Sequence, residues 1–458
     1  MENRPNSLDL PAFKSFEGTL RVPGSKSISN RALLLSALAK GETRLHYLLQ
    51  SDDTIHMGNA LAQLGVDISF FENGTEAVIK GLGSSFVAQE GKFFLGNAGT
   101  AMRSLTAALC LGNGKFTLHG EPRMHERPIG DLIFALRSLG ADIRCLENES
   151  YPPLEIHANG LKGSSVSVRG NISSQYLTAL LLCAPYTENG LTITVEGELI
   201  SKPYIALTLS MMKDFGITVK NNNFESFEIP KGVYIAPGDY EIEGDASSAS
   251  YPLAAAAISH GKVRVEGVGE NSIQGDIRFA SVLQQMGALI TYGKNWVECK
   301  GYELNAIDMD LNHIPDAAMT IAVLALFAKG TTKIRGIASW KVKETDRLFA
   351  LKTELQKLGA FVETDDDSIT ITPPAKLKSA SIDTYNDHRM AMCFSLVSLG
   401  GTPITIMDPA KGMIKMNISE FIKNWTGNIL LIKPYKKLPV YNENNYVLSI
   451  IKEIIIKN

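Results

Sequence analysis

Basic side chains lie beside serines at the start of an apolar helix near the beginning of the chain. In VPGSKSISNRALLLSALAKG, residues 22–41, a Pro-Gly pair ends a strand and Lys26 opens the helix that follows. We expect Ser27 and Ser29 to cap this helix and Gly41 to end it. Because a helix N-terminus presents unpaired N–H groups and a positive dipole end, the stretch favours a phosphate or carboxylate site. An ordinary capped helix with solvated basic residues accounts for the same pattern equally well.

Comparable side chains stand at other helix starts. The first half of the chain carries Arg31, Arg103, Arg127, Thr100, Ser173 and Ser174. The second half carries Asp316, Lys343, Glu344, Arg347, His388 and Arg389. If these helix starts face one cleft, many cations meet few carboxylates, which suits a substrate with several phosphates or carboxylates. Structural roles compete with this hypothesis: an arginine in a surface ion pair, Asp316 as a helix cap, His388 in a capping turn.

The caps of the apolar helices recur at a nearly constant interval. They fall near Ser27, Thr100, Ser173, Asp245, Asp316 and Asp387, at separations of 73, 73, 72, 71 and 71 residues. So regular a period indicates tandem structural units. Each apolar helix is followed by a strand and then by an amphipathic helix with a glycine stop, at Gly65, Gly140, Gly216, Gly287 and Gly359. Each unit is therefore predicted to be α/β, with a buried first helix and an outer second helix.

The repeated units divide naturally into two domains of three. We expect residues 24–242 to carry units one to three. Residues 1–23 and 243–458 are expected to form a discontinuous domain that carries units four to six, in which the tail, 417–458, is atypical. The two chain crossings between the domains would act as a hinge pair that closes them over a ligand.

Composition excludes several classes of partner. A net charge of −3 over 458 residues argues against nucleic acid or a membrane surface as the partner. The five cysteines are scattered and lack CxxC spacing, so we expect neither a disulfide framework nor a metal site. Apolar runs are too short to span a membrane, and the N-terminus has no apolar signal segment. A cytoplasmic protein is expected.

At the residues picked out above, the chain closely resembles the 5-enolpyruvylshikimate-3-phosphate synthases. The matching segments, in chain order, are PGSKSISNRALLLSALA, SDDT, LGNAGTAMR, GEPRMHERPIGDL, ISSQYLTALLL, SKPYI, GDASSASYPLAAAAI, NSIQGDIRFA, LNAIDMDLNHIPDAAMTIA, VKETDRL and YNDHRMAMCFSL. The resemblance implies a monomer built as a two-domain inside-out α/β barrel of six βαβαββ-type units, three per domain. It implies transfer of the enolpyruvyl group of phosphoenolpyruvate to the 5-hydroxyl of shikimate 3-phosphate, with release of phosphate and with no metal or organic cofactor. The reaction belongs to the shikimate pathway, which leads to chorismate and the aromatic amino acids.

The resemblance also assigns residues. For shikimate 3-phosphate it implies Lys26, Ser27, Arg31, Ser173, Ser174, Gln175, Ser201, Tyr204, Asp316, Ser339 and Lys343. For phosphoenolpyruvate it implies Lys26, Asn97, Gly99, Arg127, Gln175, Arg347, Arg389 and, in the divergent tail, Lys415. The expected catalytic residues are Asp316, Glu344, Lys26 and His388. In that scheme Asp316 is the base for the attacking hydroxyl, and Glu344 with Lys26 protonates the methylene carbon.

Three departures from the family pattern stand out. Ser104 occupies a position where the family has proline, which predicts weaker inhibition by glyphosate, the family's inhibitor at the phosphoenolpyruvate site. Ser339 replaces an asparagine, which predicts the loss of one contact to the substrate phosphate. After Asp408-Pro409 the family's lysine-bearing segment is not recognisable, so Lys415, Lys411 or neither takes its place.

Two other hypotheses remain beside the leading one. A UDP-N-acetylglucosamine enolpyruvyl transferase would share the architecture and the phosphoenolpyruvate chemistry, but SKPYI, ISSQ and YNDHRM favour the shikimate enzyme. A weakened binding protein would keep the shikimate 3-phosphate residues while the altered tail no longer binds phosphoenolpyruvate.

Overall fold

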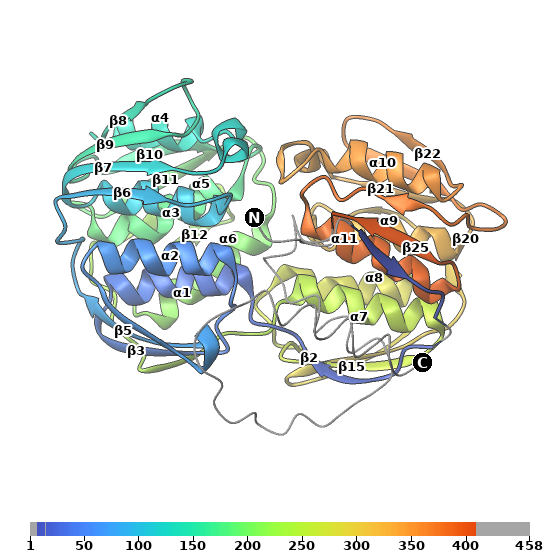
Figure 1. Ribbon diagram of the computed structural model, residues 1–458. Coiled ribbons are helices and arrows are strands. Elements are labelled where there is room, and N and C mark those ends of the chain that lie inside the picture. Colours follow the sequence, from blue (N-terminus) through green and yellow to red (C-terminus); the bar gives the residue numbers. More distant parts are fainter. Residues whose placement is uncertain (1–6, 14, 409–458) are drawn as a thin grey trace.

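Two bodies of helices and strands lie side by side and are joined by two chain segments (Figure 1). The structure, a computed structural model, describes residues 7–13 and 15–408. The predictions made for the tail, including those for Lys415 and Lys411, fall on residues 409–458 and lie outside the described residues.

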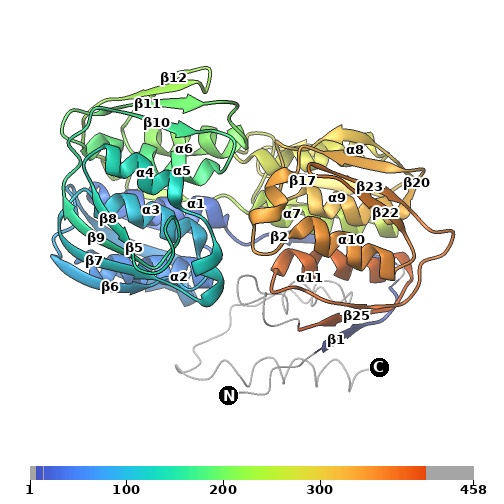
Figure 2. The same cartoon turned by 90° about the horizontal axis from the view of Figure 1, so that it is seen from above.

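Three four-stranded sheets with one common strand order lie on the outside of the first half (Figure 2). In each sheet the first two strands run parallel, and the third pairs antiparallel with the second and with the fourth. The sheets are β14 (Asp239–Glu241), β3 (Lys40–His46), β5 (Glu76–Leu82), β4 (Asp67–Phe71); β6 (Glu90–Phe94), β7 (Asn113–His119), β9 (Leu154–Asn159), β8 (Asp142–Cys145); and β10 (Ser165–Arg169), β11 (Leu191–Glu196), β13 (Ser226–Ile229), β12 (Lys220–Asn222).

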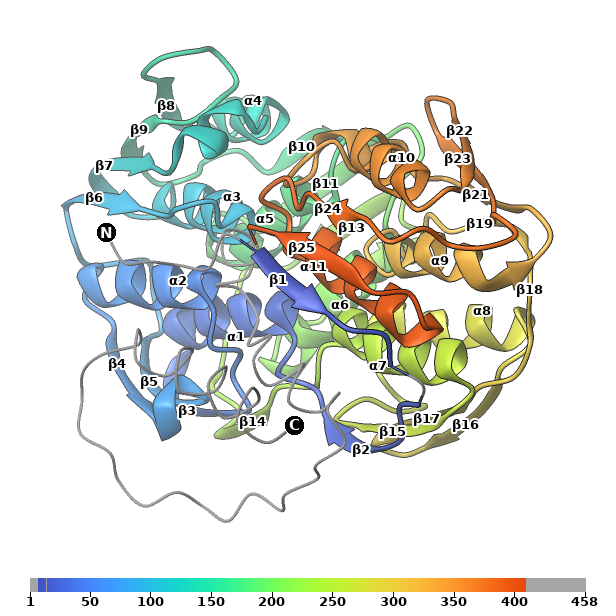
Figure 3. The same cartoon turned by 45° about the vertical axis from the view of Figure 1, so that its right-hand side comes forward.

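The second half repeats this order, with a change in its last sheet. Its sheets are β2 (Gly18–Arg21), β15 (Lys262–Glu266), β17 (Trp296–Lys300), β16 (Leu289–Gly293); β19 (Asp308–Asp310), β21 (Thr332–Arg335), β23 (Ser368–Thr372), β22 (Phe361–Thr364); and β24 (Ser381–Ile382), β25 (Ile404–Met407), β1 (Ser7–Leu10). In the last sheet β1, from the start of the chain, pairs antiparallel with β25 and takes the third place (Figure 3). A two-stranded sheet, β18 (Leu304–Asn305) and β20 (Ala328–Lys329), links neighbouring units. The predicted tandem α/β units are thus confirmed.

Buried helices fill the centre of each half. They are α1 (Lys26–Leu38), α3 (Gly99–Leu109), α5 (Ser174–Cys183), α7 (Ala246–Ser259), α9 (Ala318–Leu324) and α11 (His388–Ser395). The second helix of each unit keeps an exposed face: α2 (Asp52–Gln63), α4 (Gly130–Ser138), α6 (Lys202–Asp214), α8 (Phe279–Gln285) and α10 (Arg347–Lys357). Short 3-10 turns are η1 (Glu72–Gly74), η2 (Pro122–Glu126), η3 (Ala184–Tyr186), η4 (Gly275–Arg278), η5 (Ala325–Phe327), η6 (Ala338–Val342) and η7 (Leu396–Gly400). The predicted division is confirmed: the first helix of each unit is buried nearly all round, whereas the second helix keeps an exposed face.

Three of the predicted helix caps are confirmed. The side chains of Ser173, Asp245 and Asp387 accept hydrogen bonds from backbone N–H groups in the first turns of α5, α7 and α11. The caps predicted at Ser27, Thr100 and Asp316 are wrong, because α1, α3 and α9 begin at Lys26, Gly99 and Ala318, after Ser25, Ala98 and Ala317. At the start of α1 a carboxylate from the other half replaces the predicted cap, since the Lys26 N–H donates to Asp245 Oδ2 (3.2 Å).

The predictions that Ser29 caps the first helix and that Gly41 ends it are also wrong. Ser29 Oγ accepts from the Leu49 N–H (3.0 Å) and so fixes the loop after β3 rather than the helix start. The helix α1 ends at Leu38, and Gly41 lies inside β3 with φ +111°. The glycine stops of the second helices, by contrast, have φ between +87° and +118°, as predicted.

The two halves exchange their first strands. The strand β2 leads into α1 of the first half but pairs with β15 of the second, whereas β14 leads into α7 of the second half but pairs with β3 of the first. Val22 accordingly belongs to the apolar core of the second half and Ile242 to that of the first. These pairings support the proposal that the domains comprise residues 24–242 and residues 1–23 with 243–458.

The glycine stop after α8 provides a test of the packing in the second half. An alanine at Gly287, where φ is +118°, would bring its Cβ to 2.6 Å from the Glu303 carbonyl oxygen. An alanine at Gly359, where φ is +96°, would meet its nearest atom at 3.5 Å. In both variants alanine must adopt a positive φ, at a cost of about 1–2 kcal/mol. Gly287→Ala must in addition displace the backbone at Glu303.

We therefore expect Gly287→Ala to lower the free energy of unfolding by at least about 1 kcal/mol more than Gly359→Ala does. Urea unfolding of the two variants beside the unchanged chain measures this difference. Equal losses would contradict the tight approach at Gly287.

Candidate active site

The starts of α1 and α7 meet at the crossing between the two halves. The Ser25 N–H donates to the Glu243 carbonyl oxygen (2.8 Å), and the Asp245 N–H donates to the Pro23 carbonyl oxygen (2.8 Å). Asp245 accepts from the N–H of Lys26 in α1 and, through its other oxygen, from the N–H of Ser248 in α7 (2.8 Å). One carboxylate therefore stabilises the positive ends of two helix dipoles, one from each half.

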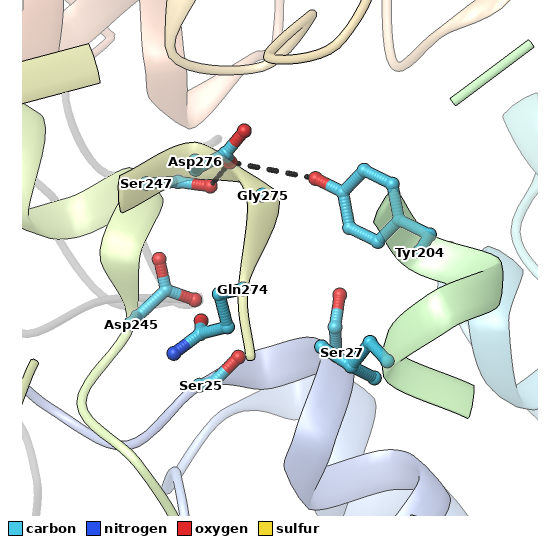
Figure 4. Close-up of a pocket in the computed structure, with 9 residues that line it drawn as sticks. Ser25, Ser27, Tyr204, Asp245, Ser247, Gln274, Gly275 and Asp276 are labelled. Atoms are coloured by element: carbon cyan, nitrogen blue, oxygen red, sulfur yellow. Dashed lines mark hydrogen bonds between the residues drawn. The ribbon is translucent and has the colours of Figure 1, made fainter. Parts of the chain in front are cut away.

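A polar pocket opens beside these helix starts (Figure 4). Ser27 and Tyr204 line it from the first half, and Asp245, Gln274 and Asp276 line it from the second. Two residues predicted to bind shikimate 3-phosphate, Ser27 and Tyr204, are thus brought together. The half-buried side chain of Lys26 lies at the same helix start and has no ion pair among the described residues.

The buried arginines of the first half have neutral partners. Arg31 donates to the hydroxyls of Thr208 (2.9 Å) and Thr178 (3.2 Å) and to the Ser27 carbonyl oxygen (2.9 Å), and burial lowers its pKa to about 10. Arg103 donates to the Pro128 carbonyl oxygen (2.9 Å). Burial, with the nearby charge of Arg127, lowers the pKa of Arg103 to about 10.

Arg127 completes this set of arginines. Its guanidinium donates to the backbone oxygen (2.8 Å) and the side-chain oxygen (2.9 Å) of Asn97, and its buried Nε has no partner within the described residues. An added Cβ at Gly99 would lie 2.6 Å from terminal nitrogens of both Arg103 and Arg127, so a larger residue would displace the two guanidiniums that flank the start of α3. Because a buried cation without a counter-charge is costly, this helix start favours an anionic ligand.

The remaining residues predicted in the first half stand at two further helix starts. Ser173 caps α5 by accepting from the Gln175 N–H (3.3 Å), and Ser174 is the first residue of that helix. Ser201 precedes α6 in the left-handed conformation (φ +54°), and its carbonyl oxygen accepts from the Tyr204 N–H (3.0 Å). These hydroxyl and amide groups can donate hydrogen bonds to a phosphate.

In the second half a buried guanidinium is surrounded by carboxylates. Arg347, 1% exposed, donates to Asp387 (2.8 Å), Asp316 (3.0 Å) and Glu344 (2.9 Å). Burial alone would favour the neutral guanidine, yet the charges of Asp387, Glu344 and Asp316 raise the pKa of Arg347 above its usual value. Arg347 therefore fixes the positions of the two carboxylates predicted to be catalytic.

Asp316 lies among three cations. Besides Arg347 it contacts Arg389 (3.1 Å) and Lys343 Nζ (3.4 Å). Burial would raise the pKa of Asp316, but the charges of Arg389, Lys343 and Arg347 outweigh it and hold that pKa well below its usual range. In this arrangement Asp316 is a firmly ionised carboxylate.

His388 and Ser339 lie close to this cluster. His388 is buried at the first position of α11, with Nδ1 3.8 Å from Asp387. Ser339 lies in η6, and its buried hydroxyl has no hydrogen-bond partner in the described part of the chain. Ser339 belongs to the fifth repeat unit and His388 to the sixth, and the roles of both stay predictions.

Arg123 makes a contact between the halves that the sequence did not indicate. From η2 its Nε donates to the Glu344 carbonyl oxygen (3.2 Å), and its terminal nitrogen donates to the Lys343 carbonyl oxygen (3.2 Å). It also pairs with Glu126 (2.7 Å), and this i,i+3 spacing resembles an ordinary surface ion pair. The sequence shows only that Arg123 lies within the segment GEPRMHERPIGDL. This local position cannot reveal a contact with Glu344, which lies 221 residues further along the chain.

Over residues 7–13 and 15–408, no group of three or more His, Cys, Asp or Glu side chains could hold a metal ion. No helix within these residues is long and apolar enough to cross a membrane.

Comparisons with known proteins agree with this geometry. A family model described as EPSP synthase (3-phosphoshikimate 1-carboxyvinyltransferase) matches residues 11–423, so the resemblance extends past Asp408-Pro409, where the sequence interpretation ended it. The chain is 61% identical over 406 residues to the 3-phosphoshikimate 1-carboxyvinyltransferase of Marinomonas sp. (strain MWYL1), covering 88% of this chain and 95% of that protein. A solved EPSP synthase from Acinetobacter baumannii matches with a TM-score of 0.75 and 28% identity, over 88% of this chain and 94% of that one. The enolpyruvyl transferase NikO from Streptomyces tendae, at 16% identity and a TM-score of 0.73, shares the fold over 92% of this chain and 96% of its own.

The contact of Arg123 predicts a local change in backbone protection. Arg123→Ala removes two donors from the carbonyl groups of Lys343 and Glu344, at about 1 kcal/mol each. We expect amide hydrogen exchange in residues 340–347 to become at least about tenfold faster, while exchange in the interior of α10 is unchanged. Mass spectrometry of peptides measures both.

Glu126→Gln is the matched control, because it removes the ion pair but leaves the donors of Arg123 in place. Equal exchange in residues 340–347 of Arg123→Ala and the unchanged chain would show that the contact does not hold this segment.

Proposed function

The chain belongs to the EPSP synthase (3-phosphoshikimate 1-carboxyvinyltransferase) family, and we propose that it transfers the enolpyruvyl group of phosphoenolpyruvate to the 5-hydroxyl of shikimate 3-phosphate. Phosphate leaves, and an enol ether remains. As a transferase of the shikimate pathway it serves the synthesis of chorismate and the aromatic amino acids. We further propose a monomer that acts in the cytoplasm.

One observation carries this function most directly. Arg31, Arg103 and Arg127 are buried in the first half with neutral partners only, among the residues that the structure describes. Two substrates that bring carboxylates and phosphates would supply the missing negative charge. The same helix starts leave serine hydroxyls and N–H groups beside these cations.

The two substrates would occupy neighbouring parts of this site. We assign shikimate 3-phosphate to Lys26, Ser27, Arg31, Ser173, Ser174, Gln175, Ser201, Tyr204, Asp316, Ser339 and Lys343. We assign phosphoenolpyruvate to Lys26, Asn97, Gly99, Arg127, Gln175, Arg347, Arg389 and Lys415. Support comes from the arginines flanking Gly99 and from the pocket lined by Ser27 and Tyr204, whereas Lys415 lies outside the described residues.

A mechanism of addition followed by elimination explains why the site needs both a base and an acid. Asp316 takes the proton of the 5-hydroxyl, whose oxygen attacks C2 of phosphoenolpyruvate. Glu344, with Lys26, gives a proton to the methylene carbon, which becomes a methyl group. In the tetrahedral adduct the C2–O bond to phosphate then breaks, and the same acid recovers a methyl proton as the double bond re-forms. Proton transfer by His388 beside Asp387 is part of this proposal.

The substrates must also change the charge balance around Asp316. The three cationic partners of Asp316 stabilise the carboxylate, hold its pKa low and make it a poor base. Substrate carboxylate and phosphate groups would bind Arg389, Lys343 and Arg347 and take over part of their charge. The pKa of Asp316 then rises, which brings it closer to the value that a general base requires.

Release of inorganic phosphate tests the function. We expect the full chain to release one phosphate for each enol ether formed, and only when both substrates are present. Asp316→Asn should lower kcat by about 100-fold or more, because a positioned base typically contributes 10²–10⁴. Binding of both substrates without phosphate release would instead support the weakened binding protein.

Inhibition by glyphosate tests the role of Ser104. Ser104 is the sixth residue of α3 and is 3% exposed, so a proline there would remove an N–H inside the helix that begins at Gly99. We expect Ser104→Pro to lower the inhibition constant of glyphosate by about tenfold, or ~1.4 kcal/mol, relative to the KM for phosphoenolpyruvate.

Ser104→Ala keeps the N–H and serves as the control, with inhibition expected to match the unchanged chain. If the unchanged chain is already inhibited as strongly as Ser104→Pro, the proposed effect of this residue is wrong.

A further inference from the structure

The carboxyl group of Asp276 joins the two halves at the pocket without having a part in the reaction scheme. We propose that Asp276 is a positioning residue for shikimate 3-phosphate binding, which acts by holding the hydroxyl of Tyr204 across the crossing between the halves. The inference rests on the proposed function, since it concerns the same substrate and the same pocket.

The geometry is that of a bridge. Asp276 lies in η4 and is 5% exposed. Its Oδ2 accepts from the Ser247 hydroxyl of α7 and from the Tyr204 hydroxyl of α6 (3.4 Å). Figure 4 shows these two hydroxyls approaching the same carboxyl group, one from each half. Removing the carboxyl group would therefore release Tyr204 from its fixed position beside Ser27.

The second oxygen of this carboxyl group is left without a partner. Asp276 Oδ1 is buried and makes no hydrogen bond to any described residue. A buried oxygen of an ionised carboxylate normally accepts at least one hydrogen bond. Burying such an oxygen without a donor costs free energy. Protonation of Oδ1 removes that cost while Oδ2 continues to accept from both hydroxyls.

The surrounding charges favour the same protonated state. The groups that face Asp276 are Tyr204 from α6, Asp245 and Ser247 at the start of α7, Asp316 before α9, and Arg389 from α11. Burial, followed by the charge of Asp316, raises the pKa of Asp276 to about 7. Hydrogen bonding by Ser247 and the charge of Arg389 only partly oppose this rise.

Binding of a substrate with two anionic groups must be linked to protonation of Asp276. When shikimate 3-phosphate enters, its negative charge raises the pKa of Asp276 further, so binding takes up a proton near neutral pH. As pH rises through that pKa, Asp276 gains a charge that repels the substrate, and binding weakens. Binding weakens as pH rises because the Asp276 carboxyl group is neutral only when it is protonated.

Asp276→Asn tests the proton directly, because the amide keeps an acceptor for Ser247 and Tyr204 but cannot ionise. We expect the dissociation constant of shikimate 3-phosphate to rise above pH 7 in the unchanged chain, by up to about tenfold per pH unit. In Asp276→Asn this contribution should be missing. Calorimetry in two buffers with different ionisation enthalpies should show a smaller proton uptake by the variant.

Two controls isolate Asp276 from other titrating groups. The substrate phosphate, with a second pKa of about 6, also titrates, but its contribution is the same in the unchanged chain and in Asp276→Asn. The difference in proton uptake between these two proteins therefore reports on Asp276 alone. Glu270→Gln makes the same carboxylate-to-amide change at an exposed position shortly before η4 and should reproduce the unchanged profile.

A double-mutant cycle tests the hold on Tyr204. Asp276→Ala and Tyr204→Phe should each weaken shikimate 3-phosphate binding, and the double variant should bind about as well as the weaker single variant. Folding of each variant is checked by thermal unfolding, and Asp276→Asn provides the isosteric fallback should Asp276→Ala not fold.

The outcomes separate this inference from the function itself. If the unchanged chain does not bind shikimate 3-phosphate, the proposed function fails. If it binds, but Asp276→Asn keeps the same pH profile and proton uptake and the cycle is additive, the inference is overturned. Loss of the pH dependence in Asp276→Asn together with a non-additive cycle supports it.

Discussion

A buried guanidinium sets the arrangement of the second half. Arg347 is almost fully enclosed and therefore needs counter-charges, which Asp316, Glu344 and Asp387 provide at 2.8–3.0 Å. These carboxylates come from segments that precede α9, α10 and α11, so one side chain fixes residues from two repeat units. The groups assigned to proton transfer are held in place by this single charge.

The two halves differ in how their buried arginines are compensated. Arg347 and Arg389 pair with carboxylates, whereas Arg31 and Arg127 have hydroxyl and carbonyl partners within the described residues. We therefore assign anion binding to the first half and proton transfer to the second as proposed functions. Exchange of the strands β2 and β14 brings the two functions together at one crossing.

Local patterns in the sequence predict most of this structure. The apolar helices, the glycine stops and the caps at Ser173, Asp245 and Asp387 follow from short-range rules. Three helix starts were misplaced by one or two residues; at α1 the reason is a distant carboxylate, Asp245, which accepts from the Lys26 N–H. The contacts of Arg123 and Asp276, and the pairing of β1 with β25, have no local signature, because they join distant segments; in the β1–β25 pair Ser7 lies opposite Met407. Such contacts arise only when segments far apart in the chain come together in the folded protein.

Deuterium incorporation tests the central claim, that carboxylates held by Arg347 move a proton onto the substrate and back. In deuterium oxide the methylene carbon of phosphoenolpyruvate should receive a deuteron, and collapse of the adduct should remove one of three methyl hydrogens. The account predicts deuterium in the enolpyruvyl methylene group of the product, measured by NMR or mass spectrometry. A product that forms without deuterium at this carbon would contradict it.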